Sequence, residues 1–159
     1  MRFIKIVCTV AIALIVASSV FSVQISGKRT AVISSLQGAV EVMSSGDTEW
    51  KAVASGAVIH EGDAIRAGKG SWAVIDTDKD GAQGKIELEE NSRIFFTELR
   101  KRDEIGKSST IIDLSIGEAL IKTKNIDKER SAFVVKTPTS FVTVEDGSAS
   151  FIIKVERVD

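Results

Sequence analysis

Short apolar runs alternate with turns rich in Gly, Asp and Ser along the chain from Thr30 onward. The runs recur about every 8 to 12 residues, and no window keeps the 3.6-residue period of an amphipathic helix. This pattern predicts a nearly all-β domain made of many short strands. The expected strands cover residues 31–36, 39–43, 50–53, 57–60, 64–66, 72–75, 85–89, 93–99, 110–115, 118–123, 132–136, 141–144 and 149–155.

Several of these segments alternate between apolar and polar positions, as Ile86, Glu87 and Leu88 do. Successive side chains of a strand point to opposite faces, so one face of each strand should lie in the core and the other in water. The turns use the matching chemistry, because Asp146-Gly147 between two apolar runs favours a hairpin. Pro138, the one proline of the chain, marks a corner or an edge, since proline cannot donate to a strand ladder.

The N-terminal stretch has the composition of an export signal. Arg2 and Lys5 precede residues 6–23, which carry no charged side chain. We therefore expect residues 1–23 to form a signal peptide or a membrane anchor, and residues 30–157 to form one β domain. Cleavage near Ser19 or Ser22 is favoured, because serines make the last turn of the apolar run a poor partner for hydrocarbon. An uncleaved anchor is the alternative, and it would be the chain's contact with the membrane.

Charge and cysteine content narrow the range of functions. The 159-residue chain has a net charge of -1, and 19 basic against 22 acidic side chains remain once the first 23 residues are set aside. Nucleic-acid binding proteins need a concentrated positive face, so we expect no nucleic-acid partner. Cys8 is the one cysteine and lies in the N-terminal segment, which excludes a disulfide framework and a cysteine nucleophile from the rest of the chain.

One acidic segment matches the spacing of a calcium-binding loop, D-x-D-x-D-G followed by a glutamate. The candidate metal ligands are Asp76, Asp78, Asp80, the carbonyl of Ala82, and Glu87. Carboxylate and carbonyl oxygens are the ligands that Ca²⁺ prefers. However, helices flank such a loop in an EF-hand, whereas strands are expected on both sides here. The segment is therefore either a strand-flanked calcium site or a solvated acidic hairpin, and no other cofactor is expected.

No catalytic constellation stands out in the chain. His60 is the only histidine, and no nucleophile motif lies near it, so we interpret it as a residue at the end of a strand. The neighbouring acids Glu89 and Glu90 would point to opposite faces of a strand, which does not suit general acid and base work. Trp50 and Trp72 are expected in the core rather than in a binding groove. We therefore expect the protein not to be an enzyme, and an envelope hydrolase is a disfavoured alternative.

The order of several short motifs resembles the FecR domain, an exported β module first associated with bacterial sigma-factor regulation. The motifs are Gly62-Asp63-Ala64-Ile65-Arg66-Ala67-Gly68, Ser71-Trp72-Ala73, Asn91-Ser92-Arg93-Ile94, Leu114-Ser115-Ile116-Gly117 and Val135-Lys136-Thr137-Pro138. The resemblance covers residues 33–155, and Gly62, Asp63 and Arg66 are expected to fix a turn and a short pairing network, which is a structural role. Near the end, Gly147 and Phe151 keep only part of the family's closing Arg-Gly-Thr-x-Phe pattern.

The resemblance implies an all-β module, solenoid-like or sandwich-like, that follows the N-terminal segment. It also implies an exported, periplasmic or envelope-associated protein with a role in signalling or protein-protein interaction. Only residues 1–5 precede the apolar segment, so a cytoplasmic domain able to hold a sigma factor is not expected. The leading hypothesis is a non-enzymatic interaction or ligand-binding module that contacts an envelope protein or a surface polymer through strand edges or loops. The alternative is a calcium-binding envelope protein that uses the segment from Asp76 to Glu87.

Overall fold

The computed structural model describes residues 26–78, 83–102, 107–127 and 129–156, and all regular secondary structure in these residues is β-strand. None of the described residues forms a helix long and apolar enough to cross a membrane. The strands are β1 Ser26–Lys28, β2 Ala31–Gln37, β3 Val40–Met43, β4 Lys51–Ala52, β5 Val58–Ile59, β6 Ala64–Ala67, β7 Trp72–Asp76, β8 Gly84–Leu88, β9 Ser92–Arg102, β10 Lys107–Ile126, β11 Ser131–Lys136, β12 Phe141–Val144 and β13 Gly147–Val155.

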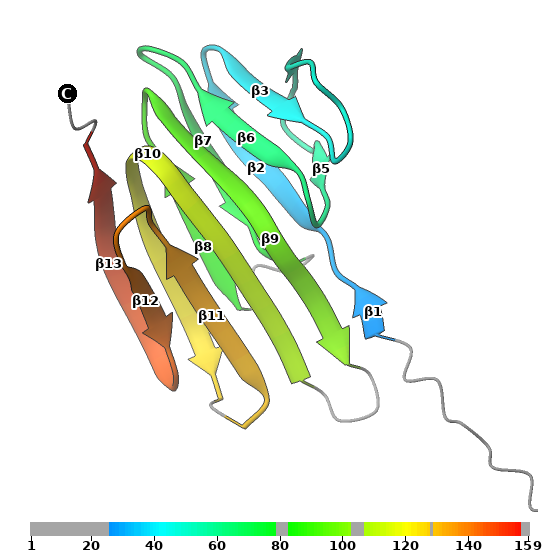
Figure 1. Ribbon diagram of the computed structural model, residues 1–159, viewed down its shortest axis with the longest axis vertical. Coiled ribbons are helices and arrows are strands. Elements are labelled where there is room, and N and C mark those ends of the chain that lie inside the picture. The colour runs from blue at the N-terminus through cyan, green and yellow to red at the C-terminus, as the bar shows by residue number, and fades with distance from the viewer. Residues whose placement is uncertain (1–25, 79–82, 103–106, 128, 157–159) are drawn as a thin grey trace, which may run out of the picture.

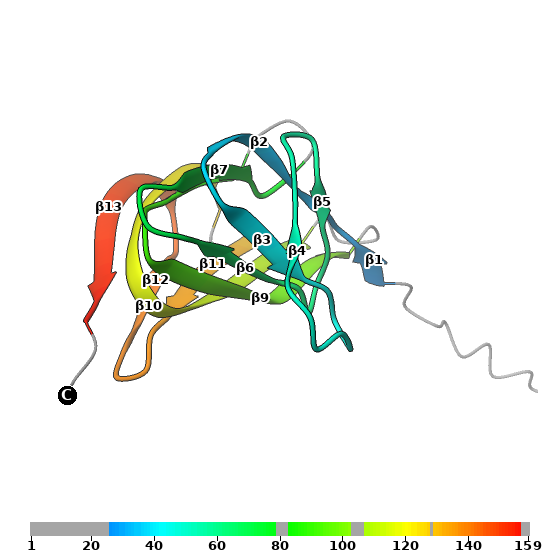
Figure 2. The same cartoon turned by 90° about the horizontal axis from the view of Figure 1, so that it is seen from above.

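The strands form one sheet that folds back on itself into two layers (Figures 1 and 2). The first layer has the order β4-β3-β6-β9-β10-β11-β12, with β1 beside the far end of β9. The second has the order β5-β2-β7-β8-β10-β13. Figure 2 shows β2 and β7 lying over β3, β6 and β9. The buried apolar side chains of both layers form one core cluster. The expected all-β fold is therefore confirmed.

Strand β10 belongs to both layers. Its residues 107–116 pair with β9, and its residues 117–126 pair with β8 and β13. The sequence pattern predicts two strands here, at 110–115 and 118–123, and that prediction is wrong. The chain bends instead of stopping, because Gly117 at φ +93° turns the strand from one layer into the other. The register also shifts between Leu114 and Ile116, which adds to the bend.

One strand pair in the sheet is parallel. Residues 108–113 of β10 pair in parallel with residues 131–136 of β11, whereas the other strand pairs in the described residues are antiparallel. Between the two segments the chain crosses to the second layer and returns. This path forms one coil of a solenoid built onto a sandwich of antiparallel strands. Both architectures that the resemblance implies are thus present in one sheet.

The core is made by the inward-facing aliphatic and aromatic side chains of both layers. Its largest fully buried members are Phe96, Phe133, Ile33, Ile59, Ile65, Ile75, Ile86, Leu88, Ile94, Leu99, Ile112 and Leu114. Neither tryptophan belongs to it, so the prediction for Trp50 and Trp72 is wrong, and both are only half-buried. In β7 the buried side chains are those of Ala73 and Ile75, which leaves Trp72 on the outer face of its layer.

Candidate functional site

The motif that begins at Gly62 holds two turns together through one buried carboxylate. Asp63 is 4% exposed. One of its oxygens accepts the backbone N–H of Ser45 at 2.9 Å, and the other accepts the N–H of His60 at 2.8 Å. Gly62 must stay small, because a Cβ on it would lie 2.6 Å from the Ser45 hydroxyl oxygen. As expected, these residues hold turns.

Two glycine–serine contacts mark the corners where the chain passes between layers. At Gly38 a Cβ would lie 2.3 Å from the Ser71 hydroxyl oxygen, which accepts the N–H of Ala39 at 2.8 Å. At Gly117 a Cβ would lie 2.1 Å from the Ser92 hydroxyl oxygen, which accepts the N–H of Glu118 at 2.8 Å. The family-like motifs around Ser71, Ser92 and Gly117 therefore meet at these corners, and their role is to bend the sheet.

Arg66 lies on the outer face of the first layer. Its Nε is 2.6 Å from a carboxylate oxygen of Glu41, and its guanidinium carbon is 4.4 Å from the centre of a Trp50 ring. Arg93 lies opposite Arg66 in the next strand and approaches the same ring at 5.5 Å. Two arginines in adjacent strands repel each other, and the carboxylate and the aromatic ring offset that repulsion. Trp50 thus supports a surface cluster rather than the core.

His60 lies at the end of β5, as expected, and its side chain is 64% exposed. Its Nδ1 is 3.6 Å from Asp63 Oδ2, the oxygen that already accepts the backbone N–H of His60. A carboxylate that serves two backbone amides stabilises a turn, so this pair has the geometry of a structural contact. The expectation that the protein is not a hydrolase stays a prediction.

Glu61 ties the turn before β6 to the far part of β9. Its carboxylate accepts hydrogen bonds from Arg100 Nε and a terminal guanidinium nitrogen at 3.0 Å each, and from the N–H of Leu99 at 3.2 Å. The hydrogen bond from Arg100 is the largest cause that lowers the pKa of Glu61, and the same pair raises the pKa of Arg100. We call this contact between the turn before β6 and strand β9 the clamp. It holds Glu61 in its charged form.

Two of the five candidate calcium ligands lie on the outer face of the second layer. Asp76 Oδ1 is 3.4 Å from Lys85 Nζ, and Glu87 Oε1 is 2.6 Å from Lys122 Nζ. In the β7–β8 register Asp76 faces Lys85, whereas Glu87 faces Val74 and so lies further along the hairpin. Asp76 Oδ1 is buried and accepts no hydrogen bond in the described structure.

Asp78 is engaged by a different set of groups. Its Oδ2 accepts the N–H of Gln83 at 3.0 Å and lies 4.0 Å from a guanidinium nitrogen of Arg29. Arg29 also donates to the Thr77 carbonyl at 2.9 Å; its burial lowers its pKa, which Asp78 partly opposes. Asp80 and Ala82 lie outside the described residues, which contain no cluster of three or more metal-ligating side chains. Calcium binding stays a prediction.

The feature that the sequence analysis missed is the end of the molecule formed by β12 and β13 (Figure 1). In the described part of the chain, β12 pairs with β11 alone and β13 pairs with β10 alone, so both strands have a free edge. Large apolar side chains are exposed there, with Phe141 at 72%, Val142 at 39% and Ile152 at 62%. We call this the open end. Monomeric proteins rarely leave a long unpaired edge beside exposed apolar side chains, so it is the best candidate for a contact surface.

The fold and the corner contacts define a small all-β module whose recognisable motifs are structural and whose free surface is a pair of strand edges. A family model described as FecR protein matches residues 63–158, and the chain belongs to this family. The match is consistent with a FecR-like envelope or signalling module. No curated protein and no solved structure matches the chain.

The matched region contains the four motifs from Asp63 onward, the acidic hairpin and the open end. It begins inside the Gly62–Gly68 motif, so β1 to β5 lie before it, as do Gly38 of one corner contact and Ser45, the partner of Asp63. The sequence signal for the open end was weak, because Phe141 and Ile152 read as ordinary strand residues. Only the pairing shows that nothing in the described chain covers them.

Proposed function

We propose that the protein is an exported, non-enzymatic interaction module of the bacterial cell envelope, and that it contacts another envelope protein or a surface polymer through the open end. The observation that carries this proposal is the free edge of β13, which is nine residues long, beside the exposed side chains of Phe141, Val142 and Ile152. Unpaired N–H and C=O groups give affinity to an added strand, and apolar side chains next to them add burial.

The position of the module in the cell follows from the N-terminal segment. Family membership supports an envelope or signalling role. The uncharged residues 6–23 favour export, with cleavage near Ser19 or Ser22 or retention as an anchor. In either case the β domain would face an extracytoplasmic partner.

The test is site-specific photocrosslinking in cells that make the full chain. A photoreactive phenylalanine analogue replaces Phe141 at the open end or, as the matched control, Val58 on β5 at the other end, where the side chain is 49% exposed. We expect covalent adducts at position 141 and none above background at position 58. A protein partner gives a discrete adduct and a polymer gives a smear. Equal labelling at both positions, or none at position 141, would contradict the proposal.

A second candidate function is calcium binding by the segment from Asp76 to Glu87. The observation that favours it is Asp76 Oδ1 at the first position of the motif, a buried carboxylate oxygen that accepts no hydrogen bond and has Lys85 Nζ at 3.4 Å as its charged partner. If the loop binds calcium, the ion raises the melting temperature by mass action, and Asp78→Ala or Asp80→Ala abolishes the rise. Asp47→Ala, which removes an exposed carboxylate elsewhere, is the control. No calorimetric heat and no shift in melting temperature would remove this candidate.

A further inference from the structure

The open end has an edge strand with few of the features that usually protect an edge. Proteins protect such strands with proline, with charged side chains, with bulges, with inward-pointing charges or by keeping them short. Strand β13 has nine residues, no proline, and a row of inward-facing side chains that is entirely apolar: Ala149, Phe151, Ile153 and Val155. Its side chains on the outer face include one charge, Lys154, close to its end. Such a strand is suited to pair with another strand.

The geometry of a twofold axis limits how β13 of one copy could pair with β13 of a second copy. If the axis is perpendicular to the sheet, the two copies run antiparallel, and residues that lie opposite each other must share a face. The axis must therefore pass beside a residue rather than between two residues. This condition leaves a small set of registers, each named by the residue that faces its own copy.

The register centred on Ile152 gives compatible neighbours at every position. On the inner face Ala149 lies opposite Val155 of the second copy, and Phe151 lies opposite Ile153. On the outer face Ile152 meets Ile152, and Lys154 meets the hydroxyl of Ser150. Cross-strand pairs of this kind stabilise a sheet, and no like charges lie opposite each other.

The adjacent registers are worse. Centring the pair on Ile153 places Lys154 opposite Ile152, which sets a charge against an exposed apolar side chain. Centring it on Phe151 pairs all nine residues of the strand, but it places Ile152 opposite Ser150, so the two exposed Ile152 side chains do not cover each other. The register with the axis beside Ile152 is therefore favoured, because it alone of the three buries the exposed Ile152 side chains against each other.

The opposite end of the molecule does not offer a competing partner for β13. Its edge strands β4 and β5 have two residues each, and the segment between them crosses from one layer to the other. A head-to-tail contact would need a long edge there, and such contacts build open chains of molecules. An end-to-end contact between two open ends closes on itself and also brings the two β12 edges, with Phe141 and Val142, to the same junction.

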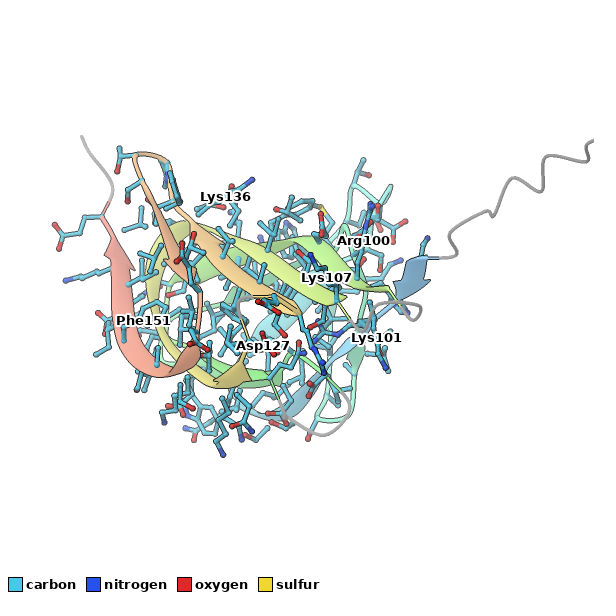
Figure 3. All side chains as sticks on the ribbon, turned by 90° about the horizontal axis from the view of Figure 1, so that it is seen from below. Arg100, Lys101, Lys107, Asp127, Lys136 and Phe151 are labelled. Carbon is cyan, nitrogen blue, oxygen red and sulfur yellow. The ribbon has the colours of Figure 1, made fainter. Side chains whose placement is uncertain are left out.

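We infer that the occupant of the open end is a second copy of this chain, joined through an antiparallel β13–β13 pair centred on Ile152, so that each sheet continues across the dimer. Figure 3 shows Phe151 on β13 at the side of the molecule away from Arg100 and Lys101, so the basic side chains near β1 stay outside this contact. The inference rests on the proposed function, because it names the occupant of the same surface.

Disulfide mapping in the full chain tests the register directly. In a Cys8→Ser background, Ile152→Cys should form a linked dimer under mild oxidation, since opposite residues in antiparallel strands have Cα atoms about 4.5–5.5 Å apart, within the range of a disulfide. Ser150→Cys alone should stay monomeric, because its two copies lie about 13 Å apart in this register. A mixture of Ser150→Cys and Lys154→Cys chains should link as a heterodimer. Val58→Cys, exposed at the other end, is the matched control.

A charge placed on the axis provides a second test. Ile152→Lys sets two like charges against each other, and photoadducts at position 141 that have twice the mass of the chain should be lost. The side chain is 62% exposed, so the monomer should keep its fold, and the melting temperature should lose the dependence on protein concentration that a dimer gives it. No disulfide at position 152, or equal linking at positions 152, 150 and 58, would overturn the dimer. Adducts at position 141 that contain only another molecule would also overturn it, yet would leave the proposed function intact, whereas no adduct at all would sink both.

Discussion

The two ends of this double-layered sheet treat their edge strands in opposite ways. At one end, β4 and β5 are two residues long, and residues 53–57 pass across the edge from one layer to the other. This segment is hydrogen-bonded to the strands beneath it, because Val53 N–H donates to the Val40 carbonyl at 3.1 Å and Gly56 N–H donates to the Ile33 carbonyl at 2.7 Å. The Ser55 hydroxyl also donates to the Ser34 carbonyl at 2.7 Å. We call this the closed end.

At the open end no described segment plays that part. The turn after Val144 leads straight into β13, and the strand then runs along the second layer with its outer edge unpaired in the described residues. Five large apolar side chains are exposed in the described residues, and three of them lie at the open end. The chain therefore covers the strand edges at one end of the sheet and, in the described residues, leaves those at the other end unpaired. A free edge in the same sheet is therefore better explained by a partner than by a general tolerance for exposed strands.

The largest effect is expected where the two ends are joined. In the described sheet β11 and β13 attach to the rest only through β10, which bends at Gly117. A Cβ there would lie 2.4 Å from Ser92 Cα, a backbone atom that cannot move aside, and the backbone has φ +93°. Gly117→Ala should lower the free energy of unfolding in urea by about 3 kcal/mol or more.

Gly147 gives the matched control for this substitution. It also has a positive φ, +76°, but a Cβ on it would meet nothing within 4 Å. Gly147→Ala should therefore cost only the backbone term, about 1 kcal/mol. Equal losses for the two variants would mean that the contact between Gly117 and Ser92 does not hold the ends together.

A smaller loss is expected from a change on the closed-end side. Asp63→Ala leaves the buried N–H groups of Ser45 and His60 without their acceptor and should cost about 2–3 kcal/mol in the free energy of unfolding. Asp63→Asn keeps one acceptor oxygen and should lose less. Asp47→Ala, which removes an exposed pair with Lys51, should change little. If all three variants unfold at the same urea concentration, the carboxylate of Asp63 has no structural role.

The contrast between the ends also shows what the sequence pattern could and could not predict. Alternating apolar positions located most strands, because a half-buried strand must alternate. Strand β1 was missed, since Ser26-Gly27-Lys28 contains no apolar residue and is held by pairing with β9. The bend of β10 was read as a break because a glycine between apolar runs is also the mark of a turn. The small number of aromatic residues favoured a core role for tryptophan, whereas Trp50 is held at the surface by Arg66.

The candidate functional residues also differ in how well the sequence predicted them. Motif spacing correctly indicated that Gly62, Asp63 and Arg66 serve the fold, because their side-chain chemistry suits a turn and an ion pair. The open end could not be predicted in this way. Whether Ile152 is covered depends on which strands pair and which remain at an edge, and pairing partners far apart in the sequence leave no local pattern.

The smallest effect concerns the clamp that fastens the turn before β6, on the closed-end side, to β9. The hydrogen bonds from Arg100 hold the folded-state pKa of Glu61 below its ordinary value of 4.5, so the folded protein binds this proton less readily than the unfolded chain does. The contribution is therefore complete above about pH 4.5 and is lost as the pH falls through the lower folded-state pKa. Because Arg100 is exposed, solvent screens the pair and the effect should be modest. Melting temperatures of the wild type and of Glu61→Gln, measured from pH 7 down to pH 3, should converge at the acid end, with the exposed Glu89→Gln as the control. Parallel curves for the wild type and Glu61→Gln would show that the clamp adds nothing, and would leave the backbone crossing at residues 53–57 as the main fastening of the closed end.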